Sequence, residues 1–441
     1  MPTTAFSPNE PAPGVRATAD SARGSDRVQE SPAGMARGVQ RRLLILSNGH
    51  GEDEIGVSLV EEIRRQAHES VSIAAWPMVG RGAAFEKSNV ARIGTQNLLP
   101  SEGFGTLSLS AFSRDLQAGW LQLHLRQLRD ARDFRGRFDF AIAVGDIVPL
   151  LAATMGRLPF ALVGCAKSVY YGPRYGYGAM ERWLLRRAHA VCYARDERTA
   201  GALLQAGVAA RYLGNPMMDR VTVRGVPLPR PPGTNVVACL PGSRSDREAN
   251  AAGILHLIAE ARDVYEHVGP THFVFALPRD FDRLAMWRTL RPPSAGALGW
   301  EQTTTAAGTD EAVSHARCGQ LHALFVQDAL GDVLAVARVA IALAGTANEQ
   351  AVGLGVPVVT FATSGVQGDY YLRMKMPFFG ESAIQVEPRA RDLADAVTRI
   401  VKDDVVHARM ASAGRERMGR PGASAAIVAD VLGHMRAPAT P

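Results

Sequence analysis

Three short segments combine small residues with charged or hydrogen-bonding side chains, and each follows a run of apolar residues. They are residues 47–53 (SNGHGED), 240–248 (LPGSRSDRE) and 344–350 (AGTANEQ). Small residues let backbone N–H groups approach a ligand closely, and a helix that begins there directs the positive end of its dipole toward that ligand. Each segment is therefore a candidate ligand-binding loop.

The second and third segments together suggest a diphosphate site. Arg244 adds a fixed positive charge that can bind phosphate oxygens bidentately. Glu349 comes one turn into a predicted helix, where its carboxylate can accept hydrogen bonds from ribose hydroxyls. Helix capping is the alternative for either segment alone, but two such segments in one half of the chain favour a nucleotide. The backbone groups expected at the phosphates belong to Gly242, Ser243, Gly345 and Thr346.

The first half of the chain offers two candidates for a catalytic base. Asp146 follows the apolar run 140–144, and His50 lies in the first glycine-rich segment. Either side chain could take the proton from an attacking hydroxyl. The structural alternatives are a helix cap for Asp146 and a turn-fixed ring for His50. Glu52 and Asp53 are expected to interact with a positive helix N-terminus.

Residues 167–177 (KSVYYGPRYGY) contain four tyrosines among glycine and proline, which predicts a loop. We expect this loop to contact a sugar or lipid head group, with an interface turn as the alternative. The residues of this loop and of the first glycine-rich segment that are expected to contact such a molecule are Asn48, Gly49, Gly51, Lys167 and Tyr170.

Asp280 and Asp282 form a DxD pair, a pattern whose carboxylates can bind a divalent cation. The pair follows Pro278 and Arg279 at a predicted helix start, so N-terminal capping is the favoured interpretation and no metal is assigned.

The apolar runs alternate with helix-length segments, which predicts parallel α/β sheets. The first unit has expected strands at 43–46, 71–75, 138–144, 160–163 and 190–193. The second has them at 235–240, 272–277, 324–327, 339–343 and 356–361. We expect two doubly wound, Rossmann-like domains facing across a cleft. The predicted divisions are a disordered leader at 1–40, a first Rossmann-like domain at 41–225, a proline-rich linker at 226–233, a second Rossmann-like domain at 234–400 and C-terminal helices and tail at 401–441.

Composition excludes several classes of protein. The chain has 441 residues, 46% hydrophobic and 21% charged, and a mean hydropathy of −0.04, which is ordinary globular usage. Its longest apolar stretches are interrupted by charges before they reach the roughly 20 residues that span a bilayer. Four scattered cysteines indicate neither a disulfide framework nor a zinc site, and residues 1–40 lack the apolar core of a secretory signal. A cytoplasmic location is expected.

Only four of the 49 basic residues are lysine, and the arginines are interleaved with acids, so nucleic acid is not an expected partner. Four apolar residues recur at helical spacing and predict a core-packing helix: Phe112, Leu116, Trp120 and Leu123. With residues 104–109, this helix is the candidate for peripheral contact with the inner face of the cytoplasmic membrane.

Segments 240–248, 344–359 (AGTANEQAVGLGVPVV) and 213–219 (LGNPMMD) resemble the lipid-A-disaccharide synthases, glycosyltransferases of the GT-B fold. More narrowly, 47–54 (SNGHGEDE) with 99–105 (LPSEGFG) resembles the lipid-A-disaccharide-synthase-related proteins of some bacteria. The resemblance extends from residue 41 to the end of the chain.

This resemblance implies a hexosyltransferase that moves an N-acetylglucosamine-type sugar from UDP to a hydroxyl of a lipid-linked acceptor, with inversion and without a metal or other cofactor. It places Arg244 on the arginine of the LPGSR motif, Glu349 on the acid that faces the nucleotide, and Asp146 near an aspartate of the segment Gly-Ile-Asp-Ala-Pro-Asp-Phe. The second aspartate of that segment is missing here, where 145–151 reads GDIVPLL. The synthases also carry Gly-Glu-x-Ser-Gly-Asp where this chain has NGHGED, so the base and the acceptor stay open.

Two other functions remain compatible with these residues. A UDP-N-acetylglucosamine 2-epimerase would use the same fold for elimination and readdition without an acceptor. A non-catalytic nucleotide-sugar-binding protein would keep the donor loops and lack the base. An NAD enzyme is disfavoured, because SNGHGEDE does not complete a GxGxxG pattern.

Overall fold

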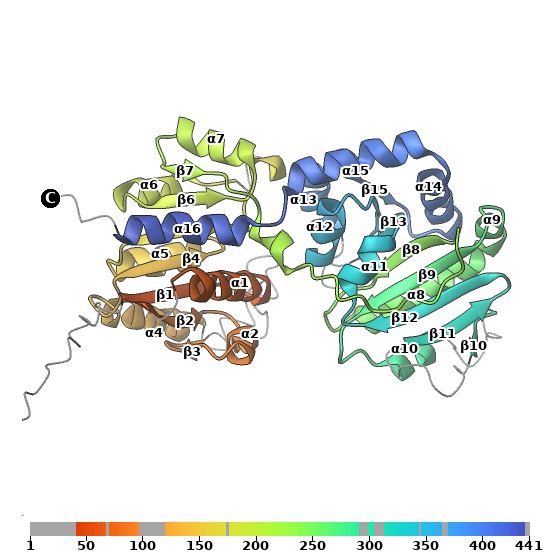
Figure 1. The fold of residues 1–441 in the computed structure, drawn as a ribbon, viewed down its shortest axis with the longest axis horizontal. Helices are drawn as coiled ribbons and strands as arrows, with labels where there is room; N and C mark the ends of the chain where they lie inside the picture. The colour runs from red at the N-terminus through yellow and green to blue at the C-terminus, as the bar shows by residue number, and fades with distance from the viewer. Residues whose placement is uncertain are drawn as a thin grey trace, which may run out of the picture. The chain divides into compact units, whose positions relative to one another are not determined.

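The computed structural model describes residues 41–67, 70–96, 120–172, 176–290, 299–303, 313–343, 345–363 and 369–436 (Figure 1). All of these belong to one compact unit that begins at Val39. The predicted leader at 1–40, the segment 99–105 and residues 104–119 of the predicted membrane-contact region lie outside the described residues.

The first half of the described chain forms a parallel sheet in the order β3-β2-β1-β4-β5-β6-β7. Its strands are β1 (Arg41–Ser47), β2 (Val71–Pro77), β3 (Ala91–Arg92), β4 (Phe140–Val144), β5 (Phe160–Gly164), β6 (Val191–Ala194) and β7 (Ala210–Arg211). Apolar residues occupy both faces of the central strands, as expected for a sheet covered by helices on both sides. The strands predicted here are confirmed, and the two-residue β3 and β7 are additions.

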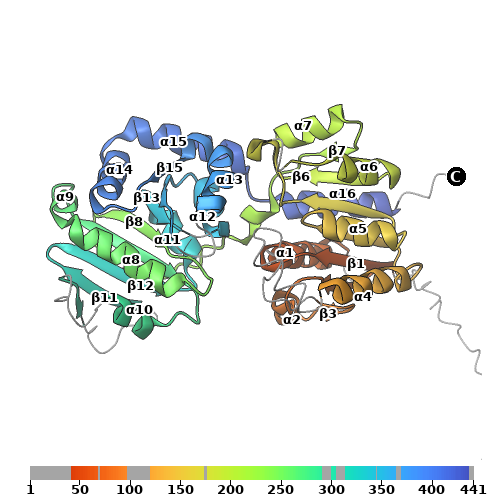
Figure 2. The ribbon, with the colours of Figure 1, turned by 180° about the vertical axis from the view of Figure 1, so that it is seen from behind.

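Alternate residues of β1 face two different layers of helices. Leu43 and Ile45 pack in the core shared with α1 (His50–Ala67) and with α16 (Ala423–Arg436), whereas Leu44 and Leu46 belong to the core on the other face. That second layer contains α4 (Trp120–Asp133), α5 (Ile147–Met155), α6 (Ala179–Arg187) and α7 (Glu197–Gln205). Figures 1 and 2 show α16 and α5 on opposite sides of this sheet.

The second half forms a sheet in the order β10-β11-β12-β9-β8-β13-β14-β15. Its strands are β8 (Asn235–Leu240), β9 (Thr271–Leu277), β10 (Glu301–Thr303), β11 (Val313–Cys318), β12 (Leu321–Gln327), β13 (Val339–Ala342), β14 (Val358–Phe361) and β15 (Ala383–Val386). The run from β12 to β15 is parallel, but β10 and β11 pair antiparallel at the edge. The expectation of a wholly parallel sheet is corrected here, because a tight turn after β11 sends the chain straight back as β12.

Helices cover both faces of the second sheet as well. One core contains α8 (Arg247–Glu260), α9 (Arg262–Glu266), α10 (Arg283–Leu290) and α14 (Ala390–Lys402). The other contains α11 (Leu330–Val336), α12 (Gly345–Gly353) and α13 (Asp369–Phe379). Helix α15 (Asp404–Met418) follows α14 along the chain and precedes α16. No helix among the described residues is both long and apolar enough to cross a membrane.

The C-terminal helix α16 returns to the first sheet. Ile427, Val428 and Val431 are buried in the core that contains α1. Asp219, in the short helix Pro216–Arg220, accepts hydrogen bonds from the N–H groups of Gly422 (2.5 Å) and Ser424 (2.7 Å) where α16 begins. Helix α16 therefore completes the hydrophobic core between α1 and the first sheet.

Both sheets reverse strand order beside their first strand, β1 in one and β8 in the other. Ligands of doubly wound folds bind at such points, beyond the carboxyl ends of the strands on either side. The loops after β1 and β4 meet at the first switch point, and the loops after β8 and β13 meet at the second. All four loops were singled out from their sequence.

Candidate functional site

The first switch point joins Asn48 to Asp146. Asn48 Nδ2 donates a hydrogen bond to Asp146 Oδ1 (2.9 Å), and the same oxygen accepts from the Val148 N–H (3.0 Å) as the N-cap of α5. Among the described residues, both of these bonds go to Oδ1, which leaves Oδ2 as the atom that could accept a proton. Burial raises the pKa of Asp146, although the Val148 N–H and the charge of Lys167 oppose the rise.

Glu52 lies in the first turn of α1, against the glycines of both loops. A Cβ atom on Gly49 would lie 2.7 Å from Glu52 Oε2, and one on Gly145 would lie 3.1 Å from Glu52 Cγ. Burial raises the pKa of Glu52 to about 7, and the carboxylates of Asp146 and Asp53 add to the rise. The expected interaction of Glu52 with a positive helix N-terminus did not indicate this rise in its pKa.

Asp53 and His50 have different surroundings. Ser47 Oγ donates a hydrogen bond to buried Asp53 Oδ1 (2.5 Å), which ties β1 to α1, and burial raises the pKa of Asp53 to about 6. His50 is exposed, and a Cβ on Gly80, in the turn after β2, would lie 3.3 Å from its ring. Of the two predicted bases, Asp146 is the one hydrogen-bonded within the switch point.

The predicted acceptor loop contributes Lys167 and Tyr170. Lys167 Nζ forms an ion pair with Glu181 of α6 (2.7 Å), whose Oε2 also accepts from the Gly178 N–H (2.8 Å). The Tyr170 ring lies 3.8 Å from the Arg417 guanidinium, in a cation–π contact with α15. The positive charge of Lys167 also favours the ionised form of Asp146.

Glu349 forms a buried cluster of charges with two cations. Its Oε2 accepts a hydrogen bond from Arg195 Nη2 (2.7 Å), its Oε1 is ion-paired with Lys375 Nζ, and the carboxylate is 2% exposed. Tyr171 Oη accepts from Arg195 Nη1 (2.6 Å) and from Lys375 Nζ (2.8 Å). Burial would raise the pKa of Glu349, but Arg195 and Lys375 outweigh burial and lower it to about 2. Ribose hydroxyls, the partners expected from the sequence, could bind only by sharing these oxygens.

The second switch point carries the predicted donor residues. Gly242 has a φ of 108°, which glycine adopts readily, and Arg247 N–H donates to the Arg244 carbonyl oxygen (3.1 Å) where α8 begins. Gly345 and Thr346 form the first turn of α12, so their N–H groups lie at its positive end. A Cβ on Gly51 would lie 3.8 Å from Thr346 Oγ1. The start of α1 and the start of α12 are therefore in van der Waals proximity.

The DxD pair is used structurally. Asp282 Oδ1 accepts from the Ala285 N–H (2.9 Å) and so caps α10, which confirms the expected capping. Asp280 Oδ2 is 3.2 Å from Arg247 Nη2. The described residues contain no group of three or more His, Cys, Asp or Glu side chains placed to hold a metal ion.

Comparisons with known proteins identify the architecture. No family model matches the chain, and neither does any curated protein sequence. Among solved structures, CalG4, the calicheamicin glycosyltransferase, shares 15% identity over 90% of this chain and 100% of its own, with a TM-score of 0.58. A UDP-N-acetylglucosamine 2-epimerase shares 12% identity over 90% and 96%, with a TM-score of 0.54. The UDP complex of MnaA from S. aureus shares 11% identity over 90% and 97%, with a TM-score of 0.54. This chain has a GT-B fold.

The predicted fold class, two Rossmann-like α/β domains, is confirmed by these GT-B structures. The sequence did not indicate that Arg195 and Lys375 belong to the site, or that the pKa of Glu52 is raised. A signal for Lys375 was available. Lysine is rare here, and two of the four lysines, Lys167 and Lys375, pair with buried glutamates at the site.

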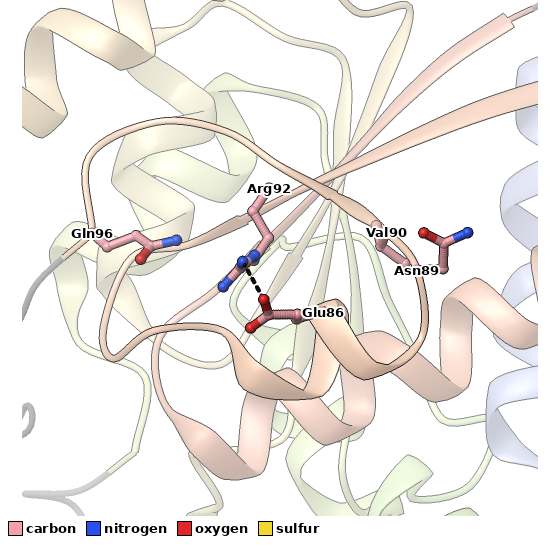
Figure 3. Close-up of a pocket in the computed structure, with 5 residues that line it drawn as sticks. All are labelled: Glu86, Asn89, Val90, Arg92 and Gln96. Carbon is pink, nitrogen blue, oxygen red and sulfur yellow. Dashed lines mark ion pairs between the residues drawn. The ribbon is translucent and has the colours of Figure 1, made fainter.

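A surface hollow elsewhere in the GT-B fold has a different lining. Figure 3 shows Glu86, Asn89, Val90, Arg92 and Gln96 around it, with Arg92 and Glu86 in an ion pair of 3.1 Å. These residues lie in and around α2 (Ala83–Lys87) and β3, and none of them is a predicted site residue. The hollow is not part of the candidate site.

The charged cluster around Glu349 predicts a pH-dependent contribution to stability. Glu349→Gln should lower the free energy of unfolding by about 3–5 kcal/mol at pH 7, because it leaves buried Arg195 without its anion. The pKa of Glu349 is lowered in the folded state, so its stabilisation is present above its ordinary pKa near 4.5 and is lost as the pH falls toward 2. Urea unfolding at several pH values measures both effects. Asp328→Asn, which breaks the exposed pair with Arg279, is the control and should cost less than about 1 kcal/mol. Equal stability of Glu349→Gln and wild type would contradict this assignment.

Proposed function

We propose that the protein is an inverting, metal-independent glycosyltransferase that moves an N-acetylglucosamine-type sugar from a UDP-sugar to a hydroxyl of a lipid-linked acceptor. The observation that carries the proposal is the proximity of two loop sets, with Gly51 of the carboxylate-bearing loops facing Thr346 of the phosphate-type loops. A transferase must hold the diphosphate of the sugar donor and the catalytic base close enough for the attacking hydroxyl to contact both the base and the sugar. The resemblance to lipid-A-disaccharide synthases supports the hexosamine donor, the lipid-linked acceptor and a cytoplasmic site with peripheral membrane contact.

The second half of the chain would bind the donor. The backbone N–H groups of Gly242, Ser243, Gly345 and Thr346 and the guanidinium of Arg244 would hold the diphosphate, and Lys375 would add positive charge nearby. Anions bind favourably at the N-terminus of a helix. The UDP complex among the compared structures supports UDP as the nucleotide. Glu349 would position Lys375 and Arg195, and would contact the ribose only if one of its ion pairs opened.

The first half would bind the acceptor and supply the base. Asp146 Oδ2 would take the proton from the acceptor hydroxyl as its oxygen bonds to the anomeric carbon. The bond from that carbon to the UDP oxygen breaks in the same step, and UDP leaves with the electron pair. The acceptor loop would place Asn48, Gly49, Gly51, Lys167 and Tyr170 around the incoming molecule. Glu52, whose pKa is raised to about 7, would hydrogen-bond a sugar oxygen as donor or acceptor.

A second function is favoured by one specific observation, the crowding of three carboxyl groups with raised pKa values: Glu52, Asp53 and Asp146. A UDP-N-acetylglucosamine 2-epimerase needs acid and base groups beside the sugar and no acceptor. Incubation with the UDP-sugar alone separates the two functions. A 2-epimer formed without acceptor supports the epimerase, whereas UDP release that depends on added lipid extract supports the transferase. Binding without either product would support a non-catalytic sensor.

The donor assignment predicts a loss of nucleotide affinity. Arg244→Ala should weaken UDP binding by roughly 1.5–3 kcal/mol, because a charge-assisted hydrogen bond to phosphate is removed. Isothermal titration of UDP is the measurement. Arg279→Ala removes an exposed arginine paired with Asp328 and should leave the affinity unchanged. If both variants bind UDP as the wild type does, Arg244 is not at the diphosphate.

The base assignment predicts a loss of turnover. Asp146→Asn preserves shape but cannot take a proton as a carboxylate does, so turnover should fall by about 10² to 10⁴ while UDP affinity persists. UDP release in the presence of lipid extract is the measurement. His50→Ala and Glu52→Gln are the paired variants. Collapse with His50→Ala and survival of Asp146→Asn would make His50 the base, and survival of all three would refute a base in these loops.

A further inference from the structure

The helix that follows the acceptor loop exposes apolar side chains to solvent. On α6, Met180 is 57% and Trp183 is 52% exposed, and on the neighbouring α7, Leu204 is 56% exposed. Arg186 Nη1 donates to the Ala206 carbonyl oxygen at the end of α7 (3.0 Å), which holds the two helices together. We call these exposed side chains of α6 and α7, with the arginines described next, the α6–α7 surface.

Positive charge surrounds Trp183 on this surface. Arg182, Arg186 and Arg187 occupy the outward half of α6, and the Arg187 guanidinium lies 5.8 Å from the Trp183 ring in a cation–π contact. Within residues 178–189 the single acid is Glu181, which is buried and paired with Lys167. The outward half of α6 therefore carries three positive charges and no negative charge.

We propose that the α6–α7 surface docks on the anionic head groups of a lipid bilayer. Tryptophan prefers the boundary between head groups and acyl chains, and arginines that flank it bind lipid phosphates. An exposed tryptophan with three arginines on the same helix matches a negatively charged lipid surface in both charge and polarity. The sequence pattern predicted membrane contact at residues 104–123 and not at α6 or α7.

The α6–α7 surface lies next to the predicted acceptor loop. Glu181 fixes the first turn of α6 to Lys167, and Lys167 lies close enough to Asp146 to influence its pKa. A bilayer under Met180 and Trp183 would therefore lie beside the acceptor loop. In this respect the inference rests on the proposed lipid-linked acceptor, but the docking itself requires neither donor nor acceptor.

Co-sedimentation of the full chain with vesicles tests the proposal. The wild type should bind phosphatidylcholine–phosphatidylglycerol vesicles and not pure phosphatidylcholine vesicles, and binding should weaken as salt is added. The double variant Met180→Gln/Trp183→Gln and the double variant Arg186→Gln/Arg187→Gln should each lower the partition coefficient by about tenfold or more. The matched control is Leu284→Gln/Val405→Gln, which removes two apolar side chains of equal or greater exposure on the second half. It should bind as the wild type does.

The outcomes separate this inference from the proposed function. Thermal unfolding with and without UDP shows that each variant is folded, and vesicle binding without UDP binding would overturn the transferase alone. Equal binding to both vesicle types, or unchanged binding of both α6 variants, would overturn the docking surface. Concentration-dependent self-association that Met180→Gln/Trp183→Gln abolishes, without vesicle binding, would also overturn it, because the surface would then be covered by a second copy.

Discussion

One buried carboxylate, that of Glu349, is held by Arg195 from the end of β6 and by Lys375 from α13. Burying these cations without an anion would be unfavourable, and removing one partner of such a cluster costs several kcal/mol. The cluster joins an element of the first sheet to two helices of the second, and α16 joins them again when it packs on α1. The two glycine-rich loop sets are consequently held near one another, with Gly51 close to Thr346.

The charges around the switch points follow from this arrangement. Backbone amides at the start of α12 and the cation Lys375 lie in the second half of the chain, whereas Glu52, Asp53 and Asp146 lie at the first switch point. Burial raises the pKa values of all three carboxyls, and the charges of Asp146 and Asp53 raise that of Glu52 further, so ionising these groups costs the folded state free energy at neutral pH. Carboxyl groups whose ionisation destabilises the folded state are typical of sites that transfer protons. The raised pKa of Glu52 is the opposite of what a helix N-terminus alone would cause, because the positive end of a helix dipole favours the charged carboxylate.

The sequence predicted the repeated parts of the fold because their signals are local. Four-residue apolar runs such as Leu43–Leu46 are buried on both faces, and glycine loops follow them at the switch points. The edge strands β10 and β11 could not be predicted, since Ser, His and Arg in 313–318 give no apolar run. The partners of Glu349 were equally inaccessible: Arg195 and Glu349 are 154 residues apart, and their contact depends on tertiary packing.

The central claim is that the loops at the second switch point bind a uridine nucleotide, and thermal unfolding of the full chain with added ligands tests it most directly. Ligand that binds only the folded state stabilises it by about 2.7 kcal/mol at a hundred times its Kd. We expect UDP and UDP-N-acetylglucosamine to raise the melting temperature in a concentration-dependent manner, and GDP and NAD to leave it unchanged. A shift with NAD alone, or none with UDP and its N-acetylglucosamine derivative, would contradict it.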